Sequence, residues 1–288
     1  MNIGILGRGF GLYGYMPAFV ELGHSVITLS EYKTTVSARP ELRDYIDLIH
    51  FVETEELLLQ SSNILTLARN PASQSSFLLE NDHRLSHLFL EKPLAENERT
   101  QEMCLERLVA QNQNFSVGYL FRFCEWWLHL KELVSTSPNT SVKIVWRIPF
   151  TPSEWKNSDS RGGGLGSFYG IHFLPLILDL GLDYQVTYSN LREDFSVVSN
   201  LNYGQKLKVG IVRNQIPNFA ISTTTGAKVE KLYSAESPFG AIGRKGVPDP
   251  RIPFIKGYVS LTLAHNNLER ERIVEKEAIR FRERLSRG

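Results

Sequence analysis

A lysine flanked by an acidic residue and a proline is the first candidate for chemistry in this chain. Glu91-Lys92-Pro93 directly follows an apolar, strand-like run, His87 to Leu90. At the carboxyl ends of strands in a parallel sheet, side chains face the crevice where ligands bind. An ammonium group there polarises a substrate oxygen and shares its proton, and partial desolvation lowers a lysine pKa toward that role. The local sequence is equally compatible with a solvated loop lysine.

His172 and Tyr169 are two further candidates for proton transfer. A histidine gains and loses a proton near neutral pH, and a tyrosine hydroxyl can donate one. Both residues follow three consecutive glycines at 162–164 and lie in an apolar stretch, 168–180, that predicts a buried helix. A hydrogen-bonded core histidine with no part in chemistry is the alternative for His172.

A glycine-rich turn, residues 7–14, follows the first strand-like run. In such a turn the first glycine permits a tight bend, and the second lets the backbone approach a pyrophosphate at the start of the next helix. Two registers fit. The register from Gly9 matches Gly-x-Gly-x-x-Gly completely but leaves Arg8 inside the strand. We favour the register from Gly7, in which Leu12 replaces the third glycine and predicts looser packing of helix on strand.

An acidic residue, Glu31, stands just after the second strand-like run. Its carboxylate can accept hydrogen bonds from the hydroxyls of an adenine ribose, which favours NAD as the cofactor. Ser30 and Lys33 beside it can instead hold a 2′-phosphate, so NADP remains open. A structural turn with a surface glutamate is the alternative. A methyltransferase that uses S-adenosylmethionine is disfavoured, because it usually has an acidic residue before its glycine turn, where this chain has apolar residues.

The order of strand-like and helix-like runs predicts an α/β fold. The first part of the chain alternates short apolar strands with helices, which is typical of a doubly wound parallel sheet, the Rossmann arrangement. Later alternating segments such as 206–212 predict a mostly antiparallel sheet. Residues 236–254 predict a loop, and 256–285 end in a charged helix. We therefore predict a nucleotide-binding domain over 1–120 and an α+β domain over 121–288.

Composition excludes several classes of function. Lys plus Arg is 32 and Asp plus Glu is 31, so the net charge of +1 creates no field that would attract nucleic acid or an anionic membrane. Cys104 and Cys124 are too few for a disulfide framework and predict reduced thiols in a cytoplasmic protein. No signal peptide or membrane span is visible in the sequence. The seven histidines lack metal-ligand spacing, so no metal site is expected.

Four sequence blocks together resemble the Gfo/Idh/MocA oxidoreductases, a family that includes glucose–fructose oxidoreductase and inositol dehydrogenase. The blocks are the glycine turn, Glu91-Lys92-Pro93, the segment 118–123 and the segment 155–172, and the resemblance covers residues 1 to about 182. It implies a Rossmann domain followed by a mostly antiparallel sheet that carries the substrate face and often an oligomer interface, hence a homo-oligomer. It also implies NAD(P)-dependent hydride transfer to or from a sugar, sugar nucleotide, cyclitol or similar polyol, with Lys92 and His172 near the reacting carbon.

Departures from the family pattern motivate a second hypothesis. Phe168 stands where the family usually has an aspartate, and Pro175 replaces a second acidic residue. Where the family tends to have Thr-Pro, this chain has Arg69-Asn70-Pro71; Arg69 is expected to contact the cofactor or an acidic substrate group, and Asn70 the ribose. The alternative function is a catalytically impaired dinucleotide-binding sensor or partner protein.

Two more residues are expected near the substrate. Arg122 ends an apolar run and can bind a carboxylate or phosphate with two hydrogen bonds, although a structural salt bridge is equally compatible. Trp155, with Lys156, matches the family's Trp-Arg pair and is expected to line the substrate pocket. The residues expected to contact the cofactor are Gly7, Gly9, Phe10, Gly11, Leu12, Glu31, Arg69, Asn70 and Glu91.

Overall fold

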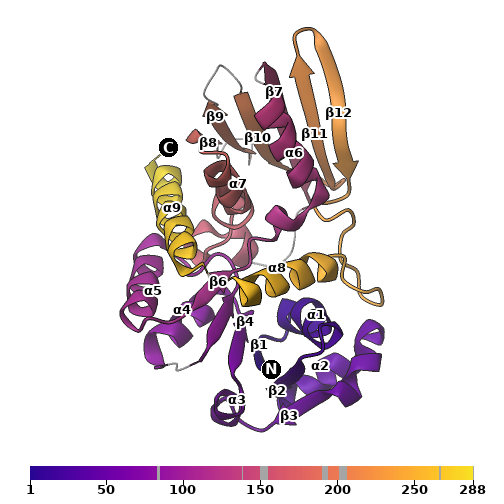
Figure 1. Ribbon diagram of the computed structural model, residues 1–288, viewed down its shortest axis with the longest axis vertical. Helices are drawn as coiled ribbons and strands as arrows, with labels where there is room; N and C mark the ends of the chain where they lie inside the picture. Colours follow the sequence, from indigo (N-terminus) through magenta and orange to yellow (C-terminus); the bar gives the residue numbers. More distant parts are fainter. Residues whose placement is uncertain are drawn as a thin grey trace. The chain divides into compact units, whose positions relative to one another are not determined.

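The chain divides into two compact units, each of which is described by itself (Figure 1). The computed structural model describes residues 1–82, 85–137, 139–149, 155–189, 194–200, 206–265 and 267–287. Unit 1 comprises Met1–Ala95, Arg99–Gly118 and Ile242–Ile273. Unit 2 comprises Glu96–Glu98, Tyr119–Ala241 and Val274–Gly288. The domains predicted from the sequence, 1–120 and 121–288, did not include the return of residues 242–273 to unit 1.

Unit 1 is built on a six-stranded parallel sheet in the order β3-β2-β1-β4-β5-β6. Its strands are short apolar runs that are almost entirely buried, as expected for a sheet covered on both faces. The chain extends the sheet from β1 to β3 in one direction and from β4 to β6 in the other, so strand order reverses between β1 and β4. The predicted Rossmann fold is confirmed. The strands are β1 (Asn2–Leu6), β2 (Ser25–Leu29), β3 (Ile49–Val52), β4 (Ile64–Leu67), β5 (His87–Leu90) and β6 (Phe115–Val117).

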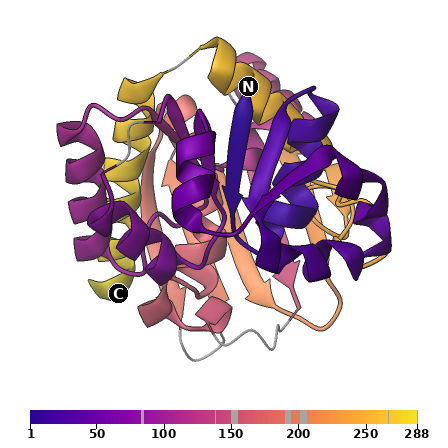
Figure 2. The ribbon, with the colours of Figure 1, turned by 90° about the horizontal axis from the view of Figure 1, so that it is seen from below.

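Helical segments connect these strands, and one further helix comes from the returning segment 242–273. Strands β1 and β2, both indigo, lie side by side in Figure 2. Local signals start some of the helices: the Thr54 side chain accepts a hydrogen bond from the backbone N–H of Leu57 and caps α3. The segments are η1 (Gly11–Tyr15), α1 (Met16–Glu21), η2 (Ser30–Tyr32), α2 (Lys33–Ser37), η3 (Pro40–Leu48), α3 (Glu55–Ser61), α4 (Pro71–Glu80), α5 (Glu98–Ala110) and α8 (Ile252–Ala264).

Unit 2 contains a mixed, mostly antiparallel sheet in the order β12-β11-β7-β10-β9-β8, as predicted. Among the described strands of this sheet, β7 and β10 pair in parallel and the other neighbours pair antiparallel. Strand β7 alternates buried and more exposed residues, so one face carries Val142, Ile144, Trp146 and Ile148 into the core. The strands are β7 (Thr140–Ile148), β8 (Asp183–Ser189), β9 (Asp194–Asn200), β10 (Lys206–Arg213), β11 (Asn218–Thr225) and β12 (Lys228–Ala235).

The helix predicted over 168–180 is wound in three different ways. A π-helical turn, η7 (Leu165–Tyr169), is followed by a 3₁₀ segment, η8 (Gly170–Phe173), and then by α7 (Leu174–Asp179). Pro175 lies in the first turn of α7, where its missing N–H costs nothing, whereas further inside an α-helix its ring would collide with the preceding turn. The other helical segments of unit 2 are η4 (Leu120–Phe123), α6 (Glu125–Thr136), η5 (Trp155–Asn157), η6 (Asp159–Arg161) and most of α9 (Leu268–Arg287).

A buried polar chain joins helix α8 to the sheet of unit 1. The Tyr258 hydroxyl donates to Ser116 Oγ at 2.7 Å, and His87 Nε2 lies 2.9 Å from the same oxygen. The ring of Tyr258 also meets Phe89 edge-on, with centroids 5.4 Å apart. Burial lowers the pKa of His87 to about 4. The returning segment is therefore part of the core of unit 1.

Because burial lowers the pKa of His87, we expect the protein to lose stability in mild acid. The unfolded chain takes up this proton near pH 6.5, but the folded protein resists it until about pH 4, so its contribution is complete above 6.5 and falls as the pH is lowered through that window. By pH 4.5 the contribution lost is about 2–3 kcal/mol, since about two pH units separate this pH from 6.5 and one pKa unit corresponds to about 1.4 kcal/mol. Urea unfolding of wild type and His87→Gln at pH 7 and pH 4.5 measures it. The difference between the two proteins should shrink at pH 4.5, and a constant difference contradicts the assignment.

Candidate functional site

The glycine-rich turn lies at the carboxyl end of β1, beside the end of β4. Gly7 has a φ of 147°, and a Cβ at this position would collide with the backbone carbonyl of Ala68. A Cβ on Gly11 would lie 3.0 Å from the side chain of Ile5 and 3.2 Å from the Cβ of Ala68. Gly9 differs from both, because nothing lies within 4 Å of the place where its Cβ would stand. The turn is therefore packed at its two ends and open at Gly9.

Leu12 is accommodated without the looser packing that its size predicted. Its side chain is completely buried. The helix after the turn begins as a π-helical segment, in which the Met16 N–H reaches back to the Gly11 carbonyl. This wider first turn admits the larger residue, and Gly11, one position earlier, provides the close approach to β1.

Glu31 lies in η2, directly after β2, and is paired with the glycine-rich turn. Its Oε2 is 2.6 Å from Arg8 Nη2, and both side chains are more than half exposed. The Arg8 guanidinium also lies over the ring of Tyr32, 5.3 Å from its centroid. An exposed ion pair of this kind contributes at most about 1 kcal/mol, so a ligand can displace it at little cost.

Arg69 and Asn70 have structural partners in unit 1. Arg69 forms an ion pair with Glu55, and its guanidinium lies over the ring of Phe77, 5.6 Å from the centroid. Asn70 caps α4, because its Oδ1 accepts a hydrogen bond of 3.0 Å from the backbone N–H of Ser73. The ligand contacts predicted for both residues remain predictions. In the structure Arg69 pairs with Glu55 and Phe77, and Asn70 caps a helix.

The Glu91-Lys92-Pro93 segment follows β5 as predicted, and a buried glutamine holds its backbone. Gln74 Oε1 accepts the Glu91 N–H at 3.0 Å, while its Nε2 donates to the Glu91 carbonyl at 2.7 Å and to the Leu94 carbonyl at 3.1 Å. The Lys92–Pro93 peptide bond is cis. The Lys92 side chain is 7% exposed. These three hydrogen bonds with Gln74 hold the backbone on both sides of Lys92.

The carboxylate of Glu91 is fully buried beside the first helix. The Tyr15 hydroxyl donates to Glu91 Oε1 at 2.8 Å. Burial raises the pKa of Glu91, and the charges of Lys92 and Arg251 together with the hydrogen bond from Tyr15 oppose that rise. Burial and the neighbouring carboxylate raise the pKa of Tyr15 well above its ordinary value, so the phenol stays a hydrogen-bond donor.

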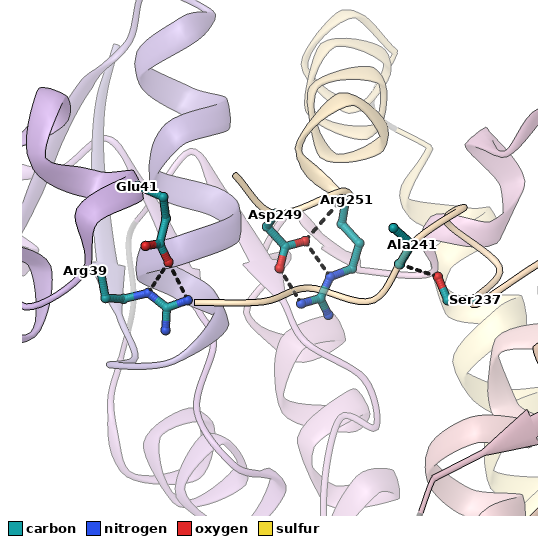
Figure 3. A network of polar contacts seen from close by, with 6 residues as sticks. All are labelled: Arg39, Glu41, Ser237, Ala241, Asp249 and Arg251. Atoms are coloured by element: carbon teal, nitrogen blue, oxygen red, sulfur yellow. Dashed lines mark hydrogen bonds and ion pairs between the residues drawn. The ribbon is translucent and has the colours of Figure 1, made fainter. Parts of the chain in front are cut away.

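The segment that returns to unit 1 brings an ion pair against the glycine-rich turn. Arg251 donates from Nε and Nη2 to the two carboxylate oxygens of Asp249, both at 2.8 Å (Figure 3). The guanidinium lies over the ring of Phe10, 3.9 Å from its centroid. The same ring fills the space beside Gly14, where a Cβ would collide with it. The Phe10 side chain is thus held by Arg251 and by the space beside Gly14, and the Phe10 backbone forms part of the turn.

A second contact fastens the same segment. Glu41 Oε2 accepts the Gly246 N–H at 2.8 Å, and Glu41 Oε1 is 2.7 Å from both Nε and Nη2 of Arg39 (Figure 3). Burial raises the pKa of Glu41, but these donors outweigh it and the net pKa is lowered. The carboxylate is therefore ionised at neutral pH and holds the loop from two sides.

His172 lies in an aromatic environment in unit 2. Its ring stacks on Phe121 with centroids 4.5 Å apart and planes 12° from parallel, and Trp146 lies 6.3 Å away. The side chain is 8% exposed. The predicted position after the glycines is observed, but η7 and η8 are not α-helical, so the expected one-turn relation between residues 168 and 172 does not apply.

Trp155, Phe168 and Tyr169 form one cluster in unit 2. Phe168 meets Trp155 and Tyr169 edge-on, with centroids 5.1 and 4.9 Å apart. Lys156 Nζ lies 5.7 Å from the ring centroids of both Trp155 and Phe168. A Cβ on Gly163 would collide with the backbone of Trp155 and Lys156, so the glycine stretch allows this close packing. The cluster is therefore apolar, with the positive charge of Lys156 beside it.

Arg122 forms the structural ion pair that was one of its two expected roles. Its Nε donates to Asp179 Oδ2, at the end of α7, with a distance of 3.0 Å. Both side chains are more than two-thirds buried. The substrate contact proposed for Arg122 remains a prediction.

Sequence reasoning missed three residues that organise unit 1. Tyr15 lies one residue beyond the glycine pattern, Gln74 lies within α4, and Arg251 was placed in a loop. The glycine pattern itself was a usable signal for Tyr15, since the helix that follows such a turn packs on the sheet. The contact of Arg251 with Phe10 had no local signal, because the two residues lie far apart in the sequence.

Two searches of the described residues bear on the class of protein. Among them, no three or more His, Cys, Asp or Glu side chains are grouped so as to hold a metal ion. In the same part of the chain, no helix has the length and apolar character needed to span a membrane.

Comparison with known proteins finds matches among solved structures. No protein-family model matches the sequence, and no curated protein matches it. The WlbA (WbpB) dehydrogenase from Thermus thermophilus, solved with NAD and UDP-GlcNAcA, matches with a TM-score of 0.67 and 14% identity, covering 100% of this chain and 95% of that one. A myo-inositol dehydrogenase from Corynebacterium glutamicum matches with a TM-score of 0.71 and 11% identity, covering 98% of this chain and 94% of that one. GenD2 from gentamicin A biosynthesis, in complex with NAD, matches with a TM-score of 0.72 and 12% identity, covering 100% of this chain and 93% of that one.

The matching structures include dehydrogenases of the Gfo/Idh/MocA type. The resemblance predicted from the sequence is therefore confirmed, and at identities this low it shows the shared fold.

Two glycines of the turn should respond in opposite ways to the same substitution. Gly9→Ala adds a methyl group in open space, so the free energy of unfolding should change by less than about 0.5 kcal/mol. Gly7→Ala forces a side chain into a positive φ and against a carbonyl, which should cost about 2 kcal/mol or more. Chemical denaturation of both variants checks this. Equal stability of the two variants contradicts the geometry described for the turn.

Proposed function

We propose that this chain is a nicotinamide-dinucleotide-dependent oxidoreductase that transfers a hydride to or from a sugar, sugar nucleotide, cyclitol or similar polyol. The observation that carries the proposal lies within unit 1. A buried lysine follows β5, and Glu91 before it is hydrogen-bonded to Tyr15, on the helical segment that follows a glycine-rich turn open at Gly9. An acidic residue, Glu31, follows β2 and pairs with Arg8 of the turn. Fold alone does not define function, but the matching dehydrogenases with bound NAD support the same use of these residues.

The residues present fit a dinucleotide. The open space at Gly9 and the helix start after it suit a pyrophosphate, with Gly7, Gly11 and Leu12 shaping the turn and Phe10 offering its backbone. Glu31 suits the hydroxyls of the adenine ribose, so we propose NAD rather than NADP. A bound nicotinamide supplies the hydride acceptor or donor.

Lys92 is the proposed proton-transferring residue. Its ammonium group would polarise the oxygen on the reacting carbon and hold or release the hydroxyl proton as that carbon changes oxidation state. Glu91 beside it supplies the compensating charge. His172, with Tyr169 near it, is the proposed second proton-transferring group in unit 2. Trp155 and Arg122 remain the proposed substrate contacts.

A non-catalytic dinucleotide-binding protein is the second candidate, and Phe168 favours it. Its ring packs on Trp155 and Tyr169 where the family has an aspartate, so one hydrogen-bonding anchor for a polyol is replaced by apolar surface. Binding of NADH without turnover of any polyol or sugar nucleotide would support this candidate. We further propose a cytoplasmic homo-oligomer, which sedimentation of the purified protein tests.

Lys92→Met is the direct test of the catalytic assignment. Loss of the ammonium group should lower kcat/KM at least about 100-fold, because general acid–base groups contribute factors of this size or more. The dissociation constant of NADH, measured by fluorescence titration, should change less than about threefold, since the turn is untouched. Lys131→Met, an exposed lysine on α6, is the matched control. Full activity in Lys92→Met would exclude this lysine from the reaction.

Glu31 should set the preference for NAD over NADP. In Glu31→Gln the hydrogen bonds to the ribose weaken and Arg8 loses its carboxylate partner, which frees a guanidinium for a 2′-phosphate. The ratio of the NADH to NADPH affinities should fall by about tenfold or more, equivalent to about 1.4 kcal/mol. Titration with both dinucleotides measures the ratio, with Glu102→Gln on the exposed face of α5 as control. An unchanged ratio argues against the ribose contact.

A further inference from the structure

Tyr15 lies at the point where the glycine-rich turn meets the lysine segment. It is the last residue of the π-helical first turn, η1, and its side chain is completely buried. Its hydroxyl donates to Glu91 Oε1 at 2.8 Å. The aromatic ring packs between Phe10, at 5.3 Å, and Phe19, at 6.0 Å, so the hydroxyl is held in one place. The hydrogen bond thus connects the first helix to the end of β5.

A glycine at the end of β6 makes room for this contact. A Cβ on Gly118 would lie 2.7 Å from the Tyr15 hydroxyl and 2.9 Å from Glu91 Oε1. Both distances are shorter than real contacts of a Cβ atom, so a larger residue at 118 would separate the two groups. The Gly118 N–H also donates to the Leu90 carbonyl at 2.9 Å, which keeps the ends of β5 and β6 together.

The main chain and the side chain of Glu91 are thus fixed independently. Gln74 binds the backbone on both sides of Lys92, and Tyr15 binds the carboxylate. The charged and titratable groups that face this carboxylate are Tyr15 from η1, Lys92 from its own segment and Arg251 from the returning segment, with Asp249 bound to Arg251. Tyr258 of α8 faces Tyr15. The Glu91 carboxyl group beside Lys92 is therefore held in one position.

We propose that Tyr15 is a positioning residue for Lys92, acting through the Glu91 carboxylate that it holds against the lysine segment. This inference rests on the proposed function, in which Lys92 transfers the proton. Because Tyr15 lies on the helix that follows the glycine turn, the same contact ties the cofactor-binding element to the proton-transferring one. Loss of the hydroxyl frees the carboxyl group to turn, which weakens its electrostatic interaction with the Lys92 ammonium group.

The test follows the proton on Lys92 directly, without turnover. Reductive methylation with ¹³C-formaldehyde labels the lysines, and NMR follows the Lys92 resonance, assigned with Lys92→Arg, as the pH is raised. In Tyr15→Phe and in Glu91→Gln the midpoint of this titration should fall by about one pH unit, because an ammonium group loses stabilisation when its anionic partner leaves. Tyr45→Phe is the matched control, since Tyr45 donates to the surface carboxylate Glu21 at the same distance, 2.8 Å.

A kinetic measurement separates this inference from the proposed function. With a substrate that wild type turns over, Tyr15→Phe should lower kcat about 10-fold or more while the KM for the dinucleotide stays within about twofold. If the wild type turns over no substrate, the proposed function fails while the Lys92 titration still judges the positioning role. An identical Lys92 midpoint in wild type, Tyr15→Phe and Glu91→Gln would overturn the inference.

Discussion

Unit 1 depends on the burial of one carboxylate, that of Glu91. A carboxyl group out of water is costly unless other groups compensate it, and burial raises the pKa of Glu91. Here three parts of the chain do so: Tyr15 donates a hydrogen bond, Lys92 lies beside it in sequence, and Arg251 arrives from a segment more than 150 positions later. The requirement gives a physical reason for the return of residues 242–273 to the first unit, since without Arg251 the buried charges would be less balanced. The ring of Phe10 under the same guanidinium links this charge balance to the glycine-rich turn.

The glycines of the chain have different structural roles, although the Gly-x-Gly-x-x-Gly pattern treats those of the turn alike. Gly7 is needed for its backbone conformation, Gly14 gives room to Phe10, and Gly118 gives room to the Tyr15–Glu91 contact. Gly9 alone in the turn faces open space, and this is where a ligand phosphate would come closest. The distinction explains why neither register of the glycine pattern accounts for the turn completely.

Unit 2 is organised around aromatic rings instead of charge. Phe121 stacks on His172 and meets Trp126 and Phe173 edge-on, so the histidine belongs to the core as well as to the proposed site. Phe168 extends the same apolar character to the position where the family resemblance implied an aspartate. Folds persist at 11–14% identity because a pattern of apolar strands and helices tolerates many residues, whereas chemistry depends on a few. Phe168 is therefore compatible with the shared fold.

The sequence by itself determined what depends on neighbours along the chain. The alternation of strands and helices, the glycine turn after β1, the acidic residue after β2 and the lysine after β5 all lie where local patterns predicted them, because period, turn and end of strand are properties of short segments. Only the tertiary structure decided the return of residues 242–273, the pairing of Arg69 with Glu55 and the hydrogen bond from Tyr15 to Glu91. These contacts join residues far apart in the sequence, and their partners are selected by burial and charge, which leave no periodic trace in the residues themselves.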